Sequence, residues 1–373
     1  MDRAPLIAFF LPSFGVGGTE RGVLALLKDF NSRRFRVHLV LARAEGSLLP
    51  EVPEGVRVID LHALRMSAAL WPFVRYLRQH RPDVIFPAMD VIDVIALLAR
   101  KIVGGPSRAV IKVTNTFSML EYPALKKAVL RLFIALSYPW ADAIITPSRG
   151  VTGEVSRLSK ASRSKITTVY NPVIGESFNK KRDEPIDHPW FQTGTPVILG
   201  VGRLARQKDF PTLVRAFALV RAQTEARLVI LGEGAERANL ENLILKLGLE
   251  EDALLLGLVP NPFPYMKRAG VFVLSSAWEG LGNVLVEALA CGCPVVSTDC
   301  PSGPREILHG GVYGELVPVG DIEAMAAAIL KVLRGEKKRV DPSWLEQFSE
   351  AHVARRYLEL AGLIQGEPAL AGR

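Results

Sequence analysis

The chain has 373 residues, of which 49% are hydrophobic and 23% are charged, so extensive disorder is excluded and the length favours two domains. Three cysteines (Cys291, Cys293 and Cys300) are too few for a disulfide framework and indicate reduced thiols. Residues 1–180 carry 25 Lys and Arg against 14 Asp and Glu, whereas residues 181–373 carry 21 against 24. The basic N-terminal half is therefore expected to meet an acidic partner, with nucleic acid, anionic lipid and a phosphorylated substrate all open at this point.

The first apolar stretch, residues 6–11, is short and leads into Pro12 and a glycine cluster. It therefore predicts a buried strand and not a signal peptide. No apolar run in the chain reaches the roughly 18 residues that a membrane span requires. Together these features predict a cytoplasmic protein.

Short apolar runs alternate with helical patterns from one end of the chain to the other. Helices are expected between the strands, for example over 19–27 and 69–79, and a last helix over 344–363. Such alternation is typical of parallel sheets covered by helices on both faces. Strands are predicted at 6–11, 37–41, 56–59, 84–86, 109–113, 143–146, 196–201, 227–231, 253–256, 271–274, 294–297 and 314–317.

The alternation stops between about 172 and 195, where three prolines and a charge run stand without an apolar period. We therefore expect an α/β protein with two doubly wound, Rossmann-like domains facing a cleft between them. The predicted parts are an N-terminal domain over 1–178, a linker over 179–195, a C-terminal domain over 196–342, and a C-terminal helical segment over 343–373 that can pack on either domain. In doubly wound sheets ligands bind beyond the carboxyl ends of the strands, so functional residues are expected in the loops that follow strands.

The first candidate loop follows residues 6–11 and contains Gly15, Gly17 and Gly18. Glycines let a backbone approach a ligand closely, and the next helix would direct its N–H groups at an anion. Gly17 and Gly18 are therefore candidate anion-binding residues, although a plain tight turn explains the glycines equally well. The spacing does not match the dinucleotide fingerprint, since Glu20 stands where its last glycine belongs.

The second candidate loop follows the strand at 196–201 and contains Arg203 and Lys208. Asp209 is expected to cap the next helix, with Pro211 in its first turn. Two cations beside a helix start suit a diphosphate, with Arg as a planar fork and Lys as a point charge. An exposed basic loop without a role is the alternative.

The third candidate loop follows the strand at 271–274 and contains Glu279 and Gly282. A helix is expected from Asn283 to a glycine stop at Gly292. The N–H groups of Gly282, Asn283 and Val284 would bind phosphate oxygens. Glu287, one turn after Asn283, would face the same ligand, where a hydroxyl pair such as a ribose is the sensible partner for a carboxylate. Glu279 would reach the other end of the ligand.

The segment 121–140 predicts a basic amphipathic helix with an apolar stripe of Leu125, Val129, Leu132, Phe133 and Leu136. Packing of this stripe against the sheet is slightly favoured, and contact with an anionic membrane stays open. No Asp-x-Asp pair and no zinc-spaced Cys or His set occurs, so no metal site and no cofactor are predicted.

These residues together resemble the retaining, nucleotide-sugar-dependent glycosyltransferases of family 4, which have the GT-B fold. The resemblance rests on Glu279 and Glu287 as an E-x7-E motif, on Arg203 and Lys208, and on the glycine loop ending at Glu20. The runs Asn171-Pro172 and 299–306 are also similar to the family, in particular to members that build bacterial polysaccharides and lipid-linked oligosaccharides.

The resemblance implies roles for individual residues. Glu287 would hold the ribose, Glu279 would contact hydroxyls of the donor sugar, and Arg203 and Lys208 would stabilise the departing diphosphate. Many members carry a histidine after the strand at 109–113. This chain lacks it there, and Asn115 is only a weak substitute. Lys126, Lys127 and Arg131 are further candidates on the acceptor side.

The predicted function is therefore metal-free, retaining transfer of a hexose or N-acetylhexosamine from a nucleotide sugar, with UDP as the expected nucleotide. The expected acceptor is lipid-linked or a polysaccharide, and the enzyme would be cytoplasmic and peripheral on the inner membrane face. A nucleotide-sugar epimerase or a phosphorylase on the same architecture stays open. A non-enzymatic membrane or nucleic-acid binder ranks lower because no nucleic-acid motif is present, so no nucleic-acid partner is expected.

Overall fold

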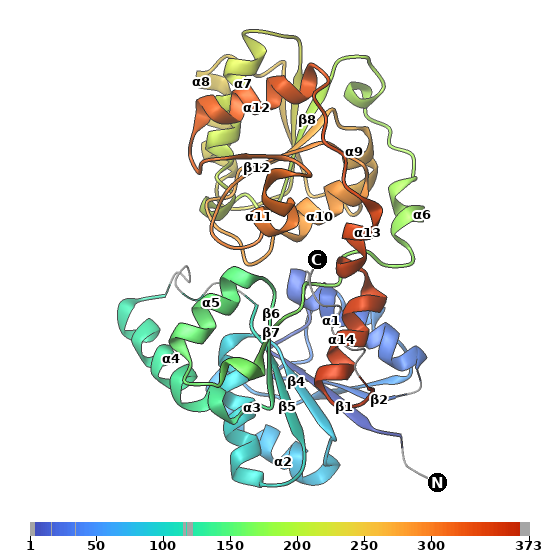
Figure 1. Cartoon of the computed structure of the whole chain (residues 1–373), viewed down its shortest axis with the longest axis vertical. Coiled ribbons are helices and arrows are strands. Elements are labelled where there is room, and N and C mark those ends of the chain that lie inside the picture. Colours follow the sequence, from blue (N-terminus) through green and yellow to red (C-terminus); the bar gives the residue numbers. More distant parts are fainter. Residues whose placement is uncertain (1–3, 16, 34, 115–116, 118–121, 366–373) are drawn as a thin grey trace. The chain divides into compact units, whose positions relative to one another are not determined.

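The computed structural model describes residues 4–365 except residues 16, 34, 115–116 and 118–121. These residues form two compact units, one from residues 1–172 and 347–373 and one from 173–346. Each unit has its own parallel sheet with helices on both faces, so the prediction of two doubly wound α/β domains is confirmed (Figure 1). No helix of the described residues has both the length and the apolarity needed to cross a bilayer.

The sheet of the first unit has seven parallel strands in the order β3-β2-β1-β4-β5-β6-β7. Every strand predicted for this half is present within a residue of the expected ends, and β7, a three-residue strand rich in threonine, was not predicted. The elements are β1 (Leu6–Leu11), α1 (Gly18–Ser32), β2 (Arg36–Leu41), η1 (Leu49–Glu51), β3 (Val56–Asp60), η2 (Met66–Ala69), α2 (Leu70–His80), β4 (Val84–Pro87), α3 (Asp90–Val103), β5 (Arg108–Lys112), α4 (Ala124–Ser137), η4 (Tyr138–Trp140), β6 (Ala143–Thr146), α5 (Arg149–Leu158), η5 (Arg163–Lys165) and β7 (Ile166–Thr168).

Successive side chains of β1 enter two different cores, because neighbouring residues of a strand face opposite sides of the sheet. Phe10 packs with side chains of α2 to α5 on one face, whereas Phe9 packs with α1 and with the C-terminal helix α14 (Glu350–Leu360) on the other. All six residues of β1 are buried, which explains why this strand reads as a continuous apolar run.

The single C-terminal helix predicted over 344–363 is wrong, because the segment is divided. It forms α13 (Pro342–Leu345), a short turn η9 (Glu346–Phe348) and α14. Ser349 starts the new helix, since its hydroxyl accepts the backbone N–H of His352 at 3.2 Å. The division coincides with the crossing of the chain from the second unit to the first.

The sheet of the second unit has six parallel strands in the order β10-β9-β8-β11-β12-β13. All its predicted strands are present, and helices α7, α8 and α12 bury one face around Phe217 and Ile329. The elements are α6 (Phe178–Arg182), η6 (Pro189–Phe191), β8 (Val197–Val201), η7 (Arg206–Lys208), α7 (Phe210–Arg221), β9 (Arg227–Leu231), α8 (Arg237–Lys246), β10 (Ala253–Gly257), α9 (Phe263–Arg268), β11 (Val271–Leu274), α10 (Asn283–Ala290), β12 (Val295–Thr298), α11 (Pro304–Ile307), η8 (His309–Gly311), β13 (Glu315–Val317) and α12 (Ile322–Leu333).

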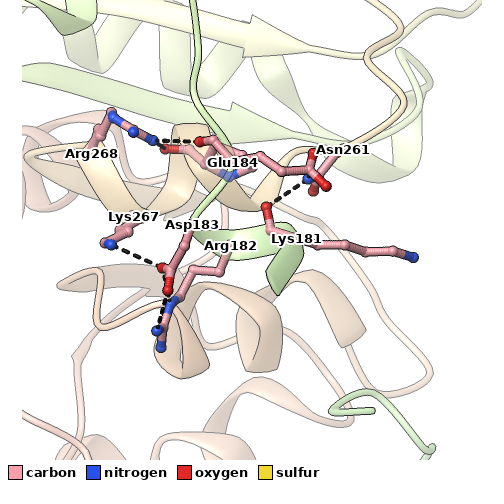
Figure 2. Close-up of polar contacts among 8 residues, drawn as sticks. Lys181, Arg182, Asp183, Glu184, Asn261, Lys267 and Arg268 are labelled. Carbon is pink, nitrogen blue, oxygen red and sulfur yellow. Dashed lines mark hydrogen bonds and ion pairs between the residues drawn. The ribbon is translucent and has the colours of Figure 1, made fainter. Parts of the chain in front are cut away.

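The charged stretch that we expected to be a linker contains the short helix α6 and is fastened to α9 of the second unit (Figure 2). The carboxylate of Asp183 accepts hydrogen bonds from Arg182 and from Lys267, each at 2.9 Å, and both cations lower the pKa of Asp183. The amide of Asn261 donates to the carbonyl of Lys181 at 2.7 Å. Polar contacts therefore fix residues 181–183 of the charged stretch to the second unit.

Candidate functional site

Both sheets reverse their strand order at one point, between β1 and β4 in the first unit and between β8 and β11 in the second. At such a point neighbouring strands send their connections to opposite faces, which leaves a crevice at the carboxyl ends. In the second unit the loops at this crevice are 202–209 and 275–282. They contain Arg203, Lys208 and Glu279, which the sequence singled out.

The two loops are joined by a buried ion pair. Nζ of Lys208 donates to Oε1 of Glu279 at 2.6 Å, and the hydroxyl of Ser276 donates to the same oxygen at 2.7 Å. The side chains of Lys208 and Glu279 are only 16% and 8% exposed. A cation and a carboxylate thus stand together at the position where the fold places a ligand, so the structure brings the two predicted residues together although 71 positions separate them.

Backbone contacts fix the same pair of loops. The hydroxyl of Ser275 donates to the carbonyl of Lys208 at 2.7 Å, and the N–H of Ala277 donates to the carbonyl of Gln207 at 2.8 Å. The amide of Gln207 returns a bond to the carbonyl of Trp278 at 3.0 Å. The ion pair is therefore held from both sides and is preorganised before any ligand arrives.

Arg203 lies in the same loop, but its side chain is exposed, and within the described part of the chain no ion pair to it is found. Helix α7 begins directly after Asp209, as predicted. Its cap differs from the prediction, because Asp209 adopts a left-handed backbone with φ of 43°. Its carboxylate accepts the hydroxyl of Thr212 at 2.7 Å in place of a backbone N–H.

Helix α10 begins at Asn283 and is followed by the glycine stop at Gly292, as predicted. Gly282 precedes it with φ of 94°, a left-handed conformation that favours glycine and turns the loop into the helix. Asn283 and Val284 are half-buried in the first turn of α10. The N-terminal end of this helix lies four residues after Glu279 in the chain. Such an end attracts anions.

Glu287 is half-buried on the next turn of α10. Burial and, secondarily, the charge of Glu287 raise the pKa of Cys291 to about 12. The three cysteines of the chain are buried free thiols, as predicted. Among the described residues, no group of three or more His, Cys, Asp or Glu side chains could hold a metal ion.

Residues 299–306, which the sequence resemblance singled out, lie in close backbone contact with the loop that contains Glu279. A Cβ at Gly303 would come within 1.8 Å of the carbonyl oxygen of Leu281, so only glycine permits this approach. Gly303 also has φ of 99°. Asp299 accepts hydrogen bonds from the guanidinium of Arg305, with Nε 3.0 Å from Oδ1. This loop therefore packs against the residues that lead into α10.

In the first unit the predicted glycine loop holds a carboxylate of the chain itself. Helix α1 begins at Gly18, and Glu20 folds back so that a Cβ on Gly17 would lie 2.1 Å from its Oε2. Burial raises the pKa of Glu20, against the lowering effect of its own backbone N–H and of Lys112. The positive end of α1 thus already faces a negative group.

Sequence reasoning missed Lys112, the last residue of β5. It is 3% exposed, and its Nζ has no hydrogen-bond partner among the described residues. Burial lowers the pKa of Lys112 to about 8, although Glu20 opposes this shift. The ring of Tyr357 lies 5.9 Å from Nζ. A lysine directly after the apolar run Ala109–Ile111 was the signal in the sequence.

A second missed group stands at the start of α3, after β4. Burial and the nearby Glu154 raise the pKa of Asp90 to about 6, and burial raises that of Asp93 well above its ordinary value. Asp93 accepts a hydrogen bond from the hydroxyl of Tyr138 at 3.3 Å. Asp90 stands three residues after the end of β4, where the loop that follows a strand at the β1–β4 crevice leads into α3, so its position in the sequence pattern could have revealed it.

The remaining acceptor-side candidates are not gathered at the crevice loops. Lys126, Lys127 and Arg131 lie on α4, where Nζ of Lys126 stacks 3.9 Å from the ring centre of Tyr122. Asn115 lies outside the residues that the structure describes. The slight preference for packing of the stripe on α4 against the sheet is wrong, because the stripe is exposed and Leu130 and Ile134 form the buried side instead.

Comparison with known proteins gives matches over both units. Residues 16–174 match the family described as Glycosyltransferase Family 4, and residues 182–343 match Glycosyl transferases group 1. A Campylobacter jejuni protein named N-acetylgalactosamine-N,N'-diacetylbacillosaminyl-diphospho-undecaprenol 4-alpha-N-acetylgalactosaminyltransferase is 34% identical over 344 residues, which is 89% of this chain and 91% of that protein.

The chain belongs to glycosyltransferase family 4.

A second relative and two solved structures also resemble this chain. The lipopolysaccharide 1,6-galactosyltransferase of Salmonella typhimurium is 27% identical over 90% of this chain and 92% of its own. The structure of Anabaena Alr3699/HepE in complex with UDP has a TM-score of 0.77 at 20% identity and covers 96% of this chain and 100% of that one. The lipopolysaccharide outer core galactosyltransferase WaaB has a TM-score of 0.75 at 23% identity, covering 95% and 98%. This family 4 glycosyltransferase thus has the GT-B fold.

Proposed function

We propose that this glycosyltransferase moves a hexose or N-acetylhexosamine from a UDP-sugar to a lipid-linked or polysaccharide acceptor, with retention at the anomeric carbon and without a metal ion. The observation that carries the proposal is the buried Lys208–Glu279 pair at the strand-order reversal of the second unit, beside the N-terminal end of α10. The names of the relatives support the acceptor class, because the Campylobacter protein acts on a diphospho-undecaprenol-linked saccharide and the Salmonella protein on lipopolysaccharide. The UDP bound to the Anabaena protein supports the nucleotide.

In this proposal the diphosphate is neutralised by Lys208, by Arg203 and by the N–H groups of Gly282, Asn283 and Val284. Lys208 is already partly neutralised by Glu279, so donor binding must redistribute this pair. We propose that Glu279 then accepts hydroxyl hydrogens of the sugar, while Glu287 accepts those of the ribose. Gly17 and Gly18 of the first unit stay proposed donor-binding residues.

Catalysis would come from positioning and from stabilisation of the charge on the leaving diphosphate, since the departing phosphate itself can take the proton of the acceptor hydroxyl. The bond from the anomeric carbon to the diphosphate breaks, and the bond to the acceptor oxygen forms on the same face. The enzyme would work without a nucleic-acid partner, as a peripheral protein on the inner face of the cytoplasmic membrane.

The test of the donor site is thermal unfolding of the full chain with UDP, GDP, ADP and dTDP, each with magnesium and with EDTA. A ligand that binds only the folded protein raises the unfolding midpoint. We expect UDP to raise it equally under both conditions and to lose this effect in Glu287→Gln. A shift that requires magnesium would contradict the metal-free site, and a shift with another nucleotide alone would contradict UDP.

A further inference from the structure

Helix α4 presents an unusual surface. Its side chains Leu130 and Ile134 are buried against the unit, where α4 packs on α3 and α5 at the outer edge of the helix layer (Figure 1). The opposite side is apolar as well and faces solvent. Together with the neighbouring Trp140, this side forms what we call the α4 face, consisting of Leu125 (78% exposed), Val129 (46%), Leu132 (58%), Phe133 (44%), Leu136 (51%) and Trp140 (37%).

Each of the five side chains on the helix stands three or four residues from another of the set, with Leu132 and Phe133 adjacent, so they form one continuous stripe. A soluble protein rarely exposes so many large apolar side chains side by side, and such patches mark contacts with proteins or membranes. An ordinary surface helix would bury this stripe and expose the other side. In α4 both sides are apolar, which indicates that the outward side also leaves water in the working state.

The charges around the α4 face decide between the two kinds of contact. Lys126, Lys127 and Arg131 lie on α4 itself, and no acidic residue occurs between Ala124 and Ser137. Nζ of Lys101 stands 5.9 Å from the ring centre of Trp140. Pairing with a second copy would bring like charges together, whereas anionic headgroups complement them.

A hydrogen bond fixes the backbone of Trp140 at the end of the stripe. Its backbone carbonyl accepts a hydrogen bond from Nη1 of Arg100 at 2.8 Å, and Arg100 also pairs with Asp142 at 2.9 Å. Indole rings prefer the boundary between headgroups and acyl chains. A tryptophan beside an apolar stripe with lysines at its margin has the composition of a helix that lies in the interface plane.

We propose that the α4 face is a docking surface for an anionic lipid bilayer, in which Leu132 and Phe133 enter the acyl boundary and the basic residues contact headgroups. The proposal rests on the proposed function in one respect, since a lipid-linked acceptor gives the enzyme a reason to dock. The membrane would hold the first unit beside the acceptor and leave the second unit to bind the donor.

The test uses the full chain and co-sedimentation with vesicles of phosphatidylcholine alone and of phosphatidylcholine with phosphatidylglycerol at 7:3. We expect binding to the anionic vesicles only, weakening as salt is raised. The double variant Leu132→Ser/Phe133→Ser should bind at least tenfold more weakly. The matched control Leu245→Ser/Leu258→Ser, at exposed positions of the second unit, should bind like wild type. Equal binding by both double variants would overturn the proposal.

Light scattering provides the second arm. A dimer that the Leu132→Ser/Phe133→Ser variant dissociates would assign the α4 face to a second copy and overturn the proposal. Transfer to a short-chain, water-soluble acceptor should proceed in that variant at the wild-type rate, while transfer to an acceptor in vesicles falls. If no transfer is found with any acceptor but vesicle binding still depends on Leu132 and Phe133, the docking surface stands and the proposed function fails.

Discussion

The Lys208–Glu279 ion pair gives the sharpest prediction about the second unit. Replacing Lys208 by Met keeps most of the side chain but leaves the carboxylate of Glu279, 8% exposed, without its cation. Breaking a fully buried pair in this way costs about 3–5 kcal/mol. Here the lysine is 16% exposed and Ser276 still donates to the carboxylate, so we expect a loss of about 2 kcal/mol. For a unit of this size that corresponds to a fall in the unfolding midpoint of about 4–8 °C.

The assay is thermal unfolding followed by circular dichroism, with turnover measured on the same samples. Two variants control for charge and for surface position. Lys208→Met/Glu279→Gln removes both charges and should recover most of the lost stability, because no uncompensated carboxylate remains. Lys331→Met removes one of the two lysines that pair with Glu315, while Lys338 remains 2.9 Å from the carboxylate, and should shift the midpoint by less than about 2 °C.

Turnover should separate the two effects. Both variants at Lys208 should lose about 10²-fold or more in turnover, the size expected when a charge that stabilises the leaving group is removed. A Lys208→Met variant that unfolds at the wild-type temperature, with a double variant less stable than the single one, would contradict the structural role of the pair. A stable double variant with wild-type turnover would contradict its role in catalysis.

Three further predictions concern other parts of the two units. Burial lowers the pKa of Lys112 in the folded state to about 8, below that of an unfolded lysine, so between about pH 8 and pH 10.5 the folded state binds fewer protons than the unfolded state. The free energy of unfolding should therefore rise by about 3 kcal/mol across this range. Unfolding midpoints at pH 7 and pH 10.5 should show the rise in wild type and not in Lys112→Met. Burial raises the pKa of Asp93 well above its ordinary value and so favours the neutral carboxyl, and the uncharged Asp93→Asn should therefore change the unfolding midpoint by less than about 3 °C; a larger fall at pH 7 would contradict this. Gly303→Ala should cost about 2–4 kcal/mol because its Cβ would meet the carbonyl of Leu281, whereas Gly292→Ala, left-handed but in open space, should cost about 1 kcal/mol; equal losses in urea unfolding would contradict the crowding argument.

Much of the fold could be predicted because parallel strands buried on both faces are short, continuous apolar runs. β1 is an example, with all six residues buried. β7 escaped prediction because a three-residue strand with two threonines lacks such a run. The break before α14 escaped because the apolar pattern continues through Phe348, while the chain crosses between the units there and Ser349 caps the start of a new helix.

The candidate site could be predicted at the level of loops but not of contacts. The order of strands and motifs places Lys208 and Glu279 after neighbouring strands, yet their 2.6 Å contact depends on the path of two loops. The stripe on α4 could be recognised from the spacing of its apolar residues, but this spacing does not say which side of the helix packs against the rest of the unit. Leu130 and Ile134 form a second, narrower apolar side, and packing selects it.

The most direct test of the central claim is transfer by the purified chain from UDP-glucose, UDP-galactose, UDP-N-acetylglucosamine and UDP-N-acetylgalactosamine to a polyprenyl-diphosphate-linked saccharide, in the presence of EDTA. UDP release would be followed together with the anomeric configuration of the product by NMR. We predict that one UDP-sugar gives acceptor-dependent UDP release, an alpha linkage that preserves the donor configuration, and no product with Lys208→Met/Glu279→Gln. A beta linkage, a strict need for a divalent metal, or full activity of that folded variant would contradict the account.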